Sequence, residues 1–257
     1  MGILNVTPDS FYDGGKFFRD ETNLLRQTEK MLEEGATFID IGGYSSRPGA
    51  AAVSQEEEKQ RVVKAVATVA KRFPEALLSV DTFRASVARE AVAAGASMIN
   101  DITGGAGDEA MVRTLGELSV PYVLMHMRGT PQTMQTLTEY DDLVVELIDY
   151  FQQRLNTLRE QHVKDVIIDP GFGFAKTIDQ NFTLLGHLDA FRALRVPILA
   201  GLSRKSTIYR TLGVDASKAL NGTTVLNTVA LLKGATILRV HDVREAVEAV
   251  QLVQHIV

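Results

Sequence analysis

The sequence predicts a single (β/α)8 barrel that spans residues 1–257, and three observations support this prediction. Short apolar runs of strand character alternate eight times with stretches of helical periodicity. No linker, repeat or low-complexity segment interrupts the alternation, and 257 residues suit one barrel of typical size. Each expected strand also ends in polar residues, at the end where such barrels place their active sites. Alternating strands and helices form a parallel sheet, and eight strands favour a closed barrel over a doubly wound sheet.

The expected strands are short apolar runs, and they cover residues 3–6, 38–41, 77–80, 98–102, 122–125, 166–168, 198–200 and 237–240. The expected helices follow them at residues 21–34, 54–72, 85–94, 108–118, 141–161, 178–194, 204–233 and 243–256. Ser54 and Glu57 form a capping-box pattern at the start of the second helix. Gly95 closes the third helix, and Gly213 is expected to break the seventh helical region.

Composition and charge exclude several classes of function. The chain is 45% hydrophobic and 23% charged with a net charge of −5, which is a normal globular balance without a nucleic-acid-binding basic stripe. It has no cysteine, which excludes disulfides and thiolate nucleophiles and fits a reducing cytoplasm. We find no apolar run of about 20 residues and no signal-peptide pattern. The expectation is a soluble cytoplasmic protein that binds neither membranes nor nucleic acids.

The polar residues at the strand ends are the candidate functional residues. A few of them could be simple helix caps or turn formers, but a polar end on every strand favours an active site. These residues are Asn5, Asp40, Asp81, Asn100, Asp101, His126, Asp169, residues 203–205, Arg239 and His241.

One group of segments is typical of an anion site. The turn at residues 42–49 places Ser46 and Arg47 between glycines. The segment at 201–206 follows the seventh strand, where many barrels bind phosphate. Arg239 and His241 are two residues apart on an extended strand, so both can face one anion. The alternatives are a surface ion pair for Arg239 and a strand-end histidine with a local partner for His241.

A second group supplies hydrogen-bond acceptors. Asp81, Asn100 and Asp169 would suit a flat heterocycle with several N–H donors, or a metal, although His126 is the one histidine beside them. Asn5 offers the neutral oxygen of a single Mg²⁺ ligand, although a turn-forming asparagine is the competing interpretation. It begins a long loop, residues 5–15, of the kind that often forms a functional lid.

These segments, in this order, resemble the dihydropteroate synthase family across essentially the whole chain. The matching stretches are residues 1–15, 40–49, 79–82, 100–101, 126–135, 168–177, 201–206 and 239–243. The resemblance implies a pterin-binding (β/α)8 barrel that joins 6-hydroxymethyl-7,8-dihydropterin diphosphate to 4-aminobenzoate and releases pyrophosphate. It also implies a Mg²⁺ requirement, inhibition by sulfonamides and a homodimer formed through the C-terminal helices.

The resemblance assigns roles to individual residues. Asn5 would bind Mg²⁺, and the substrates would contact Asp40, Ser46, Arg47, Asp81, Asn100, Asp169, Phe174, Lys205, Ser206, Arg239 and His241. Within this set, Asp81, Lys205, Arg239 and His241 are the expected catalytic residues. Two positions depart from the family pattern, because Tyr44 replaces a glutamate and Ser46 replaces a threonine.

The chemistry favours a dissociative, SN1-like step. The nitrogen of an aniline is a poor nucleophile, so the enzyme must make the pterin methylene electrophilic by stabilising the departing pyrophosphate. We see no nucleophile–base pair that would indicate a covalent intermediate. The alternatives are a methyltetrahydrofolate-binding corrinoid methyltransferase domain, a catalytically silent pterin-binding homologue and a purely structural barrel.

Overall fold

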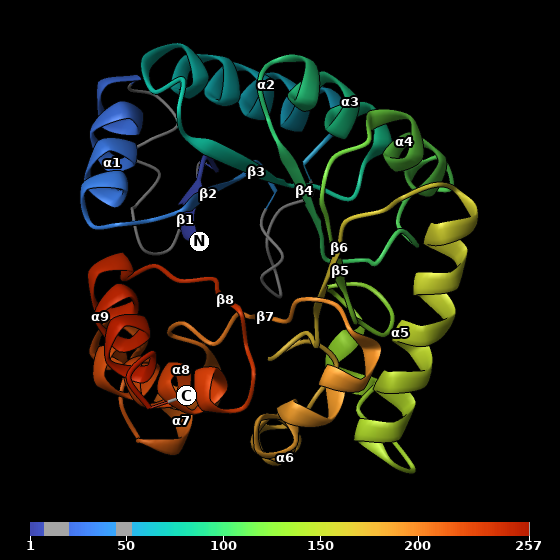
Figure 1. The fold of residues 1–257 in the computed structure, drawn as a ribbon, viewed down its shortest axis with the longest axis vertical. Coiled ribbons are helices and arrows are strands. Elements are labelled where there is room, and N and C mark those ends of the chain that lie inside the picture. Colours follow the sequence, from blue (N-terminus) through green and yellow to red (C-terminus); the bar gives the residue numbers. More distant parts are fainter. Residues whose placement is uncertain (8–20, 45–52, 257) are drawn as a thin grey trace.

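A computed structural model describes residues 1–7, 21–44 and 53–256, in which parallel strands lie inside a ring of helices (Figure 1). The strands are β1 Gly2–Asn5, β2 Phe38–Gly42, β3 Leu77–Asp81, β4 Met98–Asp101, β5 Tyr122–Met125, β6 Val166–Asp169, β7 Leu199–Ala200 and β8 Ile237–Leu238. The α-helices are α1 Glu21–Glu33, α2 Gln55–Arg72, α3 Ala85–Ala93, α4 Met111–Leu118, α5 Leu143–Glu160, α6 Ile178–Gly186, α7 Ser206–Thr211, α8 Leu220–Leu232 and α9 Val243–Val253. Short 3₁₀ turns occupy Met134–Thr136, Leu188–Leu194 and Ala216–Lys218.

The strands close into a cylinder. Strands β1 to β6 form one parallel sheet in chain order, and β7 pairs in parallel with β8. Single parallel bridges, Ile168 to Ile198 and Gly2 to Val240, join the two sheets. The Ile3 amide donates to the Val240 carbonyl at 2.9 Å, which links the last strand to the first. The fold-class prediction of an α/β barrel with parallel strands is therefore confirmed.

The strand register explains the polar site. Side chains two apart on a strand face the same side, so residues alternate between the barrel interior and the helix layer. Met98, Val123, Ile167 and Leu199 form one small buried cluster inside the barrel. On β4, Asn100 lies two residues beyond Met98 and therefore faces the same side, as Asp169 does beyond Ile167 on β6. Phe38 and Ile237 pack against this cluster, and the residues two positions beyond them are Asp40 and Arg239. The same face thus changes from apolar to polar toward the carboxyl ends of the strands.

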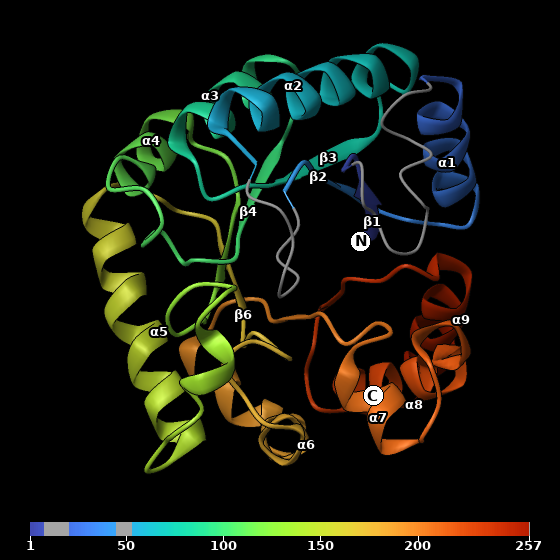
Figure 2. The ribbon, with the colours of Figure 1, turned by 180° about the vertical axis from the view of Figure 1, so that it is seen from behind.

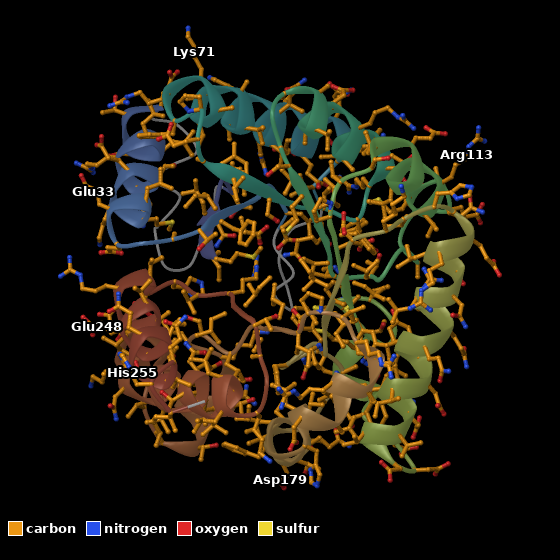
Figure 3. All side chains as sticks on the ribbon, viewed as in Figure 1. Glu33, Lys71, Arg113, Asp179, Glu248 and His255 are labelled. Carbon is orange, nitrogen blue, oxygen red and sulfur yellow. The ribbon has the colours of Figure 1, made fainter. Side chains whose placement is uncertain are left out.

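The second core lies between the strands and the helices. Alternate strand residues such as Ile39, Val80 and Ile168 are fully buried there against the apolar faces of the helices. Among the described residues, no helix is long and apolar enough to cross a membrane. Polar side chains point outward from the helices and from the turn after α9, as they do for the residues labelled in Figure 3: Glu33, Lys71, Arg113, Asp179, Glu248 and His255.

The main differences from the sequence expectations concern helices. The helix predicted at residues 178–194 is divided, because α6 ends at Gly186 and His187 adopts a non-helical conformation before a 3₁₀ turn. The helical region at 204–233 is broken, as predicted near Gly213, into α7, a 3₁₀ turn and α8. Ser54 caps α2 by accepting from the Glu57 amide, which is one half of the predicted capping box, while the Glu57 carboxylate pairs with Arg61. Helices α1 and α9 lie side by side in both views and complete the ring (Figure 2).

Candidate active site

A buried network of an arginine, two aspartates and an asparagine occupies the barrel interior. The Arg239 guanidinium donates from Nε to Asp40 at 2.6 Å and from Nη2 to Asp81 at 2.8 Å. Asn100 donates its amide to the same Asp40 oxygen at 3.0 Å. Among the described residues, the other oxygen of Asp40 is buried without a hydrogen-bond partner. The network therefore joins β2, β3, β4 and the end of β8, and it leaves one acceptor for a further donor.

Burial opposes the charges of this network. It raises the pKa of Asp81 to about 7, although the neighbouring Arg239 acts in the opposite direction. For Arg239, burial alone would lower the pKa, but Asp40 and Asp81 together raise it above its ordinary value. Arg239 therefore stays charged, and it neutralises the carboxylates of Asp40 and Asp81 even when no substrate anion is bound. The sequence placed Arg239 at a diphosphate site, and the structure adds this second role.

A second cluster lies at the ends of β6 and β7. The Asp169 carboxylate accepts from the Gly171 amide at 2.8 Å, and burial raises the pKa of Asp169. Lys205 donates to the Phe172 carbonyl, and its ammonium lies 4.8 Å from the centre of the Phe174 ring. Burial lowers the pKa of Lys205 to about 8, although Asp169 acts to raise it. An ammonium and a carboxylate thus face the same space beside an aromatic ring.

The position of Gly201 shows that Lys205 and Asp169 lie close to each other. A Cβ on this glycine would lie 3.7 Å from the Lys205 Nζ atom and 3.9 Å from an Asp169 carboxylate oxygen. The charge of Arg239 also affects the pKa values of both Lys205 and Asp169. The two clusters therefore act as one electrostatic unit, with three carboxylates and two cations.

His241 and Ser203 bring the loops after β7 and β8 together. The Ser203 hydroxyl lies 3.0 Å from the His241 Nδ1 atom and also accepts from the His241 amide at 3.2 Å. Next to them, Arg204 forms a bidentate ion pair with Asp242, with both distances 2.8 Å. Arg204 holds this position with a left-handed φ of 53°. The sequence did not single out Asp242 as a partner, since an ion pair between two loops has no local pattern.

Asn5 lies at the mouth beside Asp81. Its Oδ1 atom is 3.5 Å from the point where a Cβ on Gly42 would lie, and an Asp81 carboxylate oxygen is 3.8 Å from the same point. Among the described residues, no group of three or more histidine, cysteine or acidic side chains could hold a metal ion. One amide oxygen near a carboxylate fits Mg²⁺, because this ion often keeps most of its water ligands.

Several other predicted residues have defined places. Ser206 is the first residue of α7 and is half-buried. Ser46 and Arg47 lie outside the described residues, as do residues 8–15 of the predicted lid loop. Tyr44, which departs from the family pattern, packs edge-on against Phe83 with ring centres 5.2 Å apart. Gln132 also donates to the Tyr44 hydroxyl at 3.4 Å, so the aromatic side chain connects three loops of the mouth.

Sequence reasoning missed Lys176, which the structure places beside His126. Its Nζ atom lies 3.1 Å from the His126 Nδ1 atom, and both side chains are buried. Lys176 falls within the stretch at residues 168–177 that carries the family resemblance, which was the available signal. By contrast, His162, His187 and His255 are exposed.

Comparisons with known proteins identify the family of this chain. The family model described as pterin binding enzyme matches residues 1–241. The dihydropteroate synthase of Escherichia coli strain K12 is 43% identical over 256 residues, which cover 99% of this chain and 90% of the relative. This similarity sets aside the corrinoid methyltransferase and the purely structural barrel.

Solved structures show the same relationship. A Yersinia pestis dihydropteroate synthase in a sulfonamide drug complex superposes with a TM-score of 0.94 at 42% identity, covering 100% of this chain and 93% of the other. A Xanthomonas albilineans dihydropteroate synthase with 4-aminobenzoic acid gives a TM-score of 0.91 at 40% identity, with coverages of 100% and 92%. The chain therefore belongs to the pterin-binding enzyme family as a dihydropteroate synthase, a transferase of folate biosynthesis.

Proposed function

We propose that the chain joins 6-hydroxymethyl-7,8-dihydropterin diphosphate to 4-aminobenzoate by a dissociative step. The bond between the pterin methylene and the diphosphate oxygen breaks first, and its electron pair leaves with pyrophosphate. The aminobenzoate nitrogen then donates its lone pair to the methylene carbon and loses one proton. The products are 7,8-dihydropteroate and pyrophosphate.

The observation that carries this proposal is the electrostatic unit formed by Asp40, Asp81, Asp169, Lys205 and Arg239. Its three carboxylates exceed its two cations in charge when all are ionised. Because burial raises the pKa of Asp81 to about 7, the field of the unit favours a pterin-centred cation most strongly above this pH. The carboxylates, together with Asn100, also provide acceptors for the N–H groups of a pterin ring. Lys205 would donate to a ring acceptor beside Asp169.

The other substrate groups would lie nearer the mouth. The diphosphate would lie by His241 and Ser203, with Ser46, Arg47 and the outer side of Arg239 as further partners. Phe174 and Ser206 would form the aminobenzoate site beside Lys205. The complexes of the Yersinia relative with a sulfonamide drug and of the Xanthomonas relative with 4-aminobenzoic acid support 4-aminobenzoate as a substrate and sulfonamides as inhibitors. His241 would stabilise the negative charge that develops on the leaving oxygen.

Mg²⁺ would be held by Asn5 and water, close to the Asp81 carboxylate. When bound, the ion would neutralise charge on the diphosphate and so favour its departure. The residues of the chain perform the remaining tasks, because they bind and orient the pterin and screen its methylene from water.

We also propose that residues 1–257 form one domain, act in the cytoplasm and assemble as a homodimer. Large apolar side chains are exposed on the last three helices and near them, as expected for an interface. They are Leu212, Val225, Leu232, Leu252 and Ile256. A Val225→Glu variant would shift the mass measured by light scattering from dimer to monomer. A monomeric native protein at micromolar concentration would contradict this assembly.

The test of the reaction uses purified protein, both substrates and Mg²⁺, with mass spectrometry for 7,8-dihydropteroate. We expect product that disappears with EDTA and decreases when a sulfonamide competes with aminobenzoate. Pterin binding without any product, in the presence of Mg²⁺, would instead identify a catalytically silent homologue.

A further inference from the structure

Lys176 is a buried lysine that the proposed reaction does not use. Only 6% of its surface is exposed, and it lies between α6 and the turn that follows β6. Its ammonium contacts three acceptors: the Gly171 carbonyl at 3.1 Å, the Phe174 carbonyl at 3.0 Å and the His126 Nδ1 atom at 3.1 Å. An ammonium has three donors, so these contacts use its full hydrogen-bonding capacity. Burial lowers the pKa of Lys176 to about 7, so the side chain is an ammonium below this pH.

His126 is suited to receive one of these hydrogen bonds. It follows β5, and its amide donates to the Asp169 carbonyl at 3.0 Å, which fixes the backbone of one residue against the other. Its ring packs edge-on against Tyr150, with centres 4.8 Å apart. Burial lowers the pKa of His126 to about 2, so the imidazole is neutral and Nδ1 can accept.

The turn at residues 171–174, which Lys176 contacts, also forms contacts with the candidate pterin-binding residues. The amide of Gly171 orients Asp169, the carbonyl of Phe172 accepts from Lys205, and the ring of Phe174 lies next to the Lys205 ammonium. Lys176 contacts the carbonyls of the first and last residues of this turn. It therefore acts on the same short segment as Lys205, but from the opposite, buried side.

The glycines of the turn show how closely it is packed between the two lysines. Gly171 has a φ of 73°, and a Cβ there would come 2.1 Å from the His126 carbonyl oxygen and 3.5 Å from the Lys176 Nζ atom. Gly173 has a φ of 80°, and a Cβ there would come 3.2 Å from the Lys205 side chain. A segment with so little free space transmits a change on one side to the other.

We propose that Lys176 and His126 are positioning residues for pterin capture. The ammonium of Lys176 ties both ends of the turn at residues 171–174 to His126, and this sets the Phe172 carbonyl that aligns Lys205. The inference rests on the proposed role of Asp169 and Lys205 in pterin binding. A purely structural role would instead affect stability and leave the affinity of the folded protein unchanged.

The first experiment measures the affinity of full-length Lys176→Met for 6-hydroxymethylpterin by calorimetry. We expect the Kd to rise at least tenfold, because the methionine side chain fills the space but donates no hydrogen bond. Leu155→Ala is the matched control, because it removes a buried side chain of α5, outside the turn at residues 171–174, and lowers stability. An unchanged Kd for Lys176→Met, or an equal rise for Leu155→Ala, would overturn the proposal.

The second experiment restores the ammonium chemically. The chain has no cysteine, so Lys176→Cys introduces a single thiol that can be aminoethylated in denaturant before refolding. The resulting side chain has the length and charge of lysine, and we expect it to recover most of the lost pterin affinity. Propylation supplies an adduct of similar size without the charge, and it should not recover the affinity. Equal recovery by both adducts would show that only volume matters and would refute the positioning role.

Lys205→Ala separates this inference from the proposed function. If Lys205→Ala abolishes pterin binding while Lys176→Met binds normally, the inference fails and the proposed site stands. If Lys205→Ala binds the pterin normally, the proposed site itself is wrong.

Discussion

At the scale of single residues, the site depends on charged side chains whose burial costs free energy. Neighbouring groups of opposite charge offset this cost. Arg239 is shared by Asp40 and Asp81, while Lys205 and Asp169 moderate each other. Strand periodicity could predict that these residues face the interior. It could not predict which charges form pairs, because pairing depends on the register between strands that are distant in sequence.

Lys205 gives a prediction for the pH dependence of pterin binding. Its pKa is lowered by burial to about 8, so above this pH the free protein loses the ammonium that would contact the pterin. We expect the affinity to fall by up to about tenfold for each pH unit above 8. Calorimetry of native protein and of Lys205→Met from pH 6 to 10 provides the measurement. A parallel decline in both proteins would assign the effect to the pterin, or to Lys176 and Asp81 with their pKa values of about 7, rather than to Lys205.

His126 gives a prediction for stability. Its pKa is about 2 in the folded chain and ordinarily 6.5, so below pH 6.5 the unfolded state binds a proton that the folded state does not. The contribution of His126 to the free energy of unfolding therefore falls as the pH decreases below 6.5, by about 1.4 kcal/mol per pH unit. We expect the difference in unfolding free energy between native protein and His126→Asn to shrink by about 2 kcal/mol from pH 6.5 to 5. Urea denaturation at both pH values measures it, and a constant difference would show that His126 titrates normally.

At the scale of elements, the structure adds connections between loops to a pattern of strands and helices that the sequence predicts well. Apolar runs located every strand, because a strand buried on both faces reads as a continuous apolar segment. The helix predicted at residues 178–194 was wrong in its second half, where periodicity alone does not distinguish an α-helix from a 3₁₀ turn. The loops were less predictable, since their partners lie in other loops.

The ion pair between Arg204 and Asp242 is the clearest such connection. Both side chains are mostly buried, with 8% and 16% exposure, and the pair joins the loops that carry Lys205 and His241. We expect Asp242→Ala to lower the unfolding free energy by about 3 kcal/mol, because it leaves a buried guanidinium without its carboxylate. The control is Asp189→Ala, which removes the exposed pair with Lys233 and should cost less than about 1 kcal/mol. Similar losses in the two variants, measured by chemical denaturation, would contradict this role.

At the scale of the whole molecule, barrel closure assembles the site. Arg239 follows the last strand, whereas Asp40 and Asp81 lie on the second and third. Their ion pairs form because β8 meets β1 across the bridge between Val240 and Gly2. The alternation of strands and helices was sufficient to predict the closed fold. The polar strand ends predicted a group of site residues, of which the structure brings Asp40, Asp81, Asn100 and Arg239 into one network. The roles given to Asn5, Ser46, Arg47 and His241, and to every other site residue, stay predictions.

A crystal structure of the protein soaked with 6-hydroxymethylpterin tests the central claim most directly. We predict a pterin ring inside the barrel mouth, with its N–H groups on Asp81, Asn100 and Asp169 and with Lys205 donating to a ring acceptor. The turn at residues 171–174 should keep its contacts with Lys176. A pterin bound elsewhere, or one that leaves Asp169 and Lys205 without contact, would contradict the account.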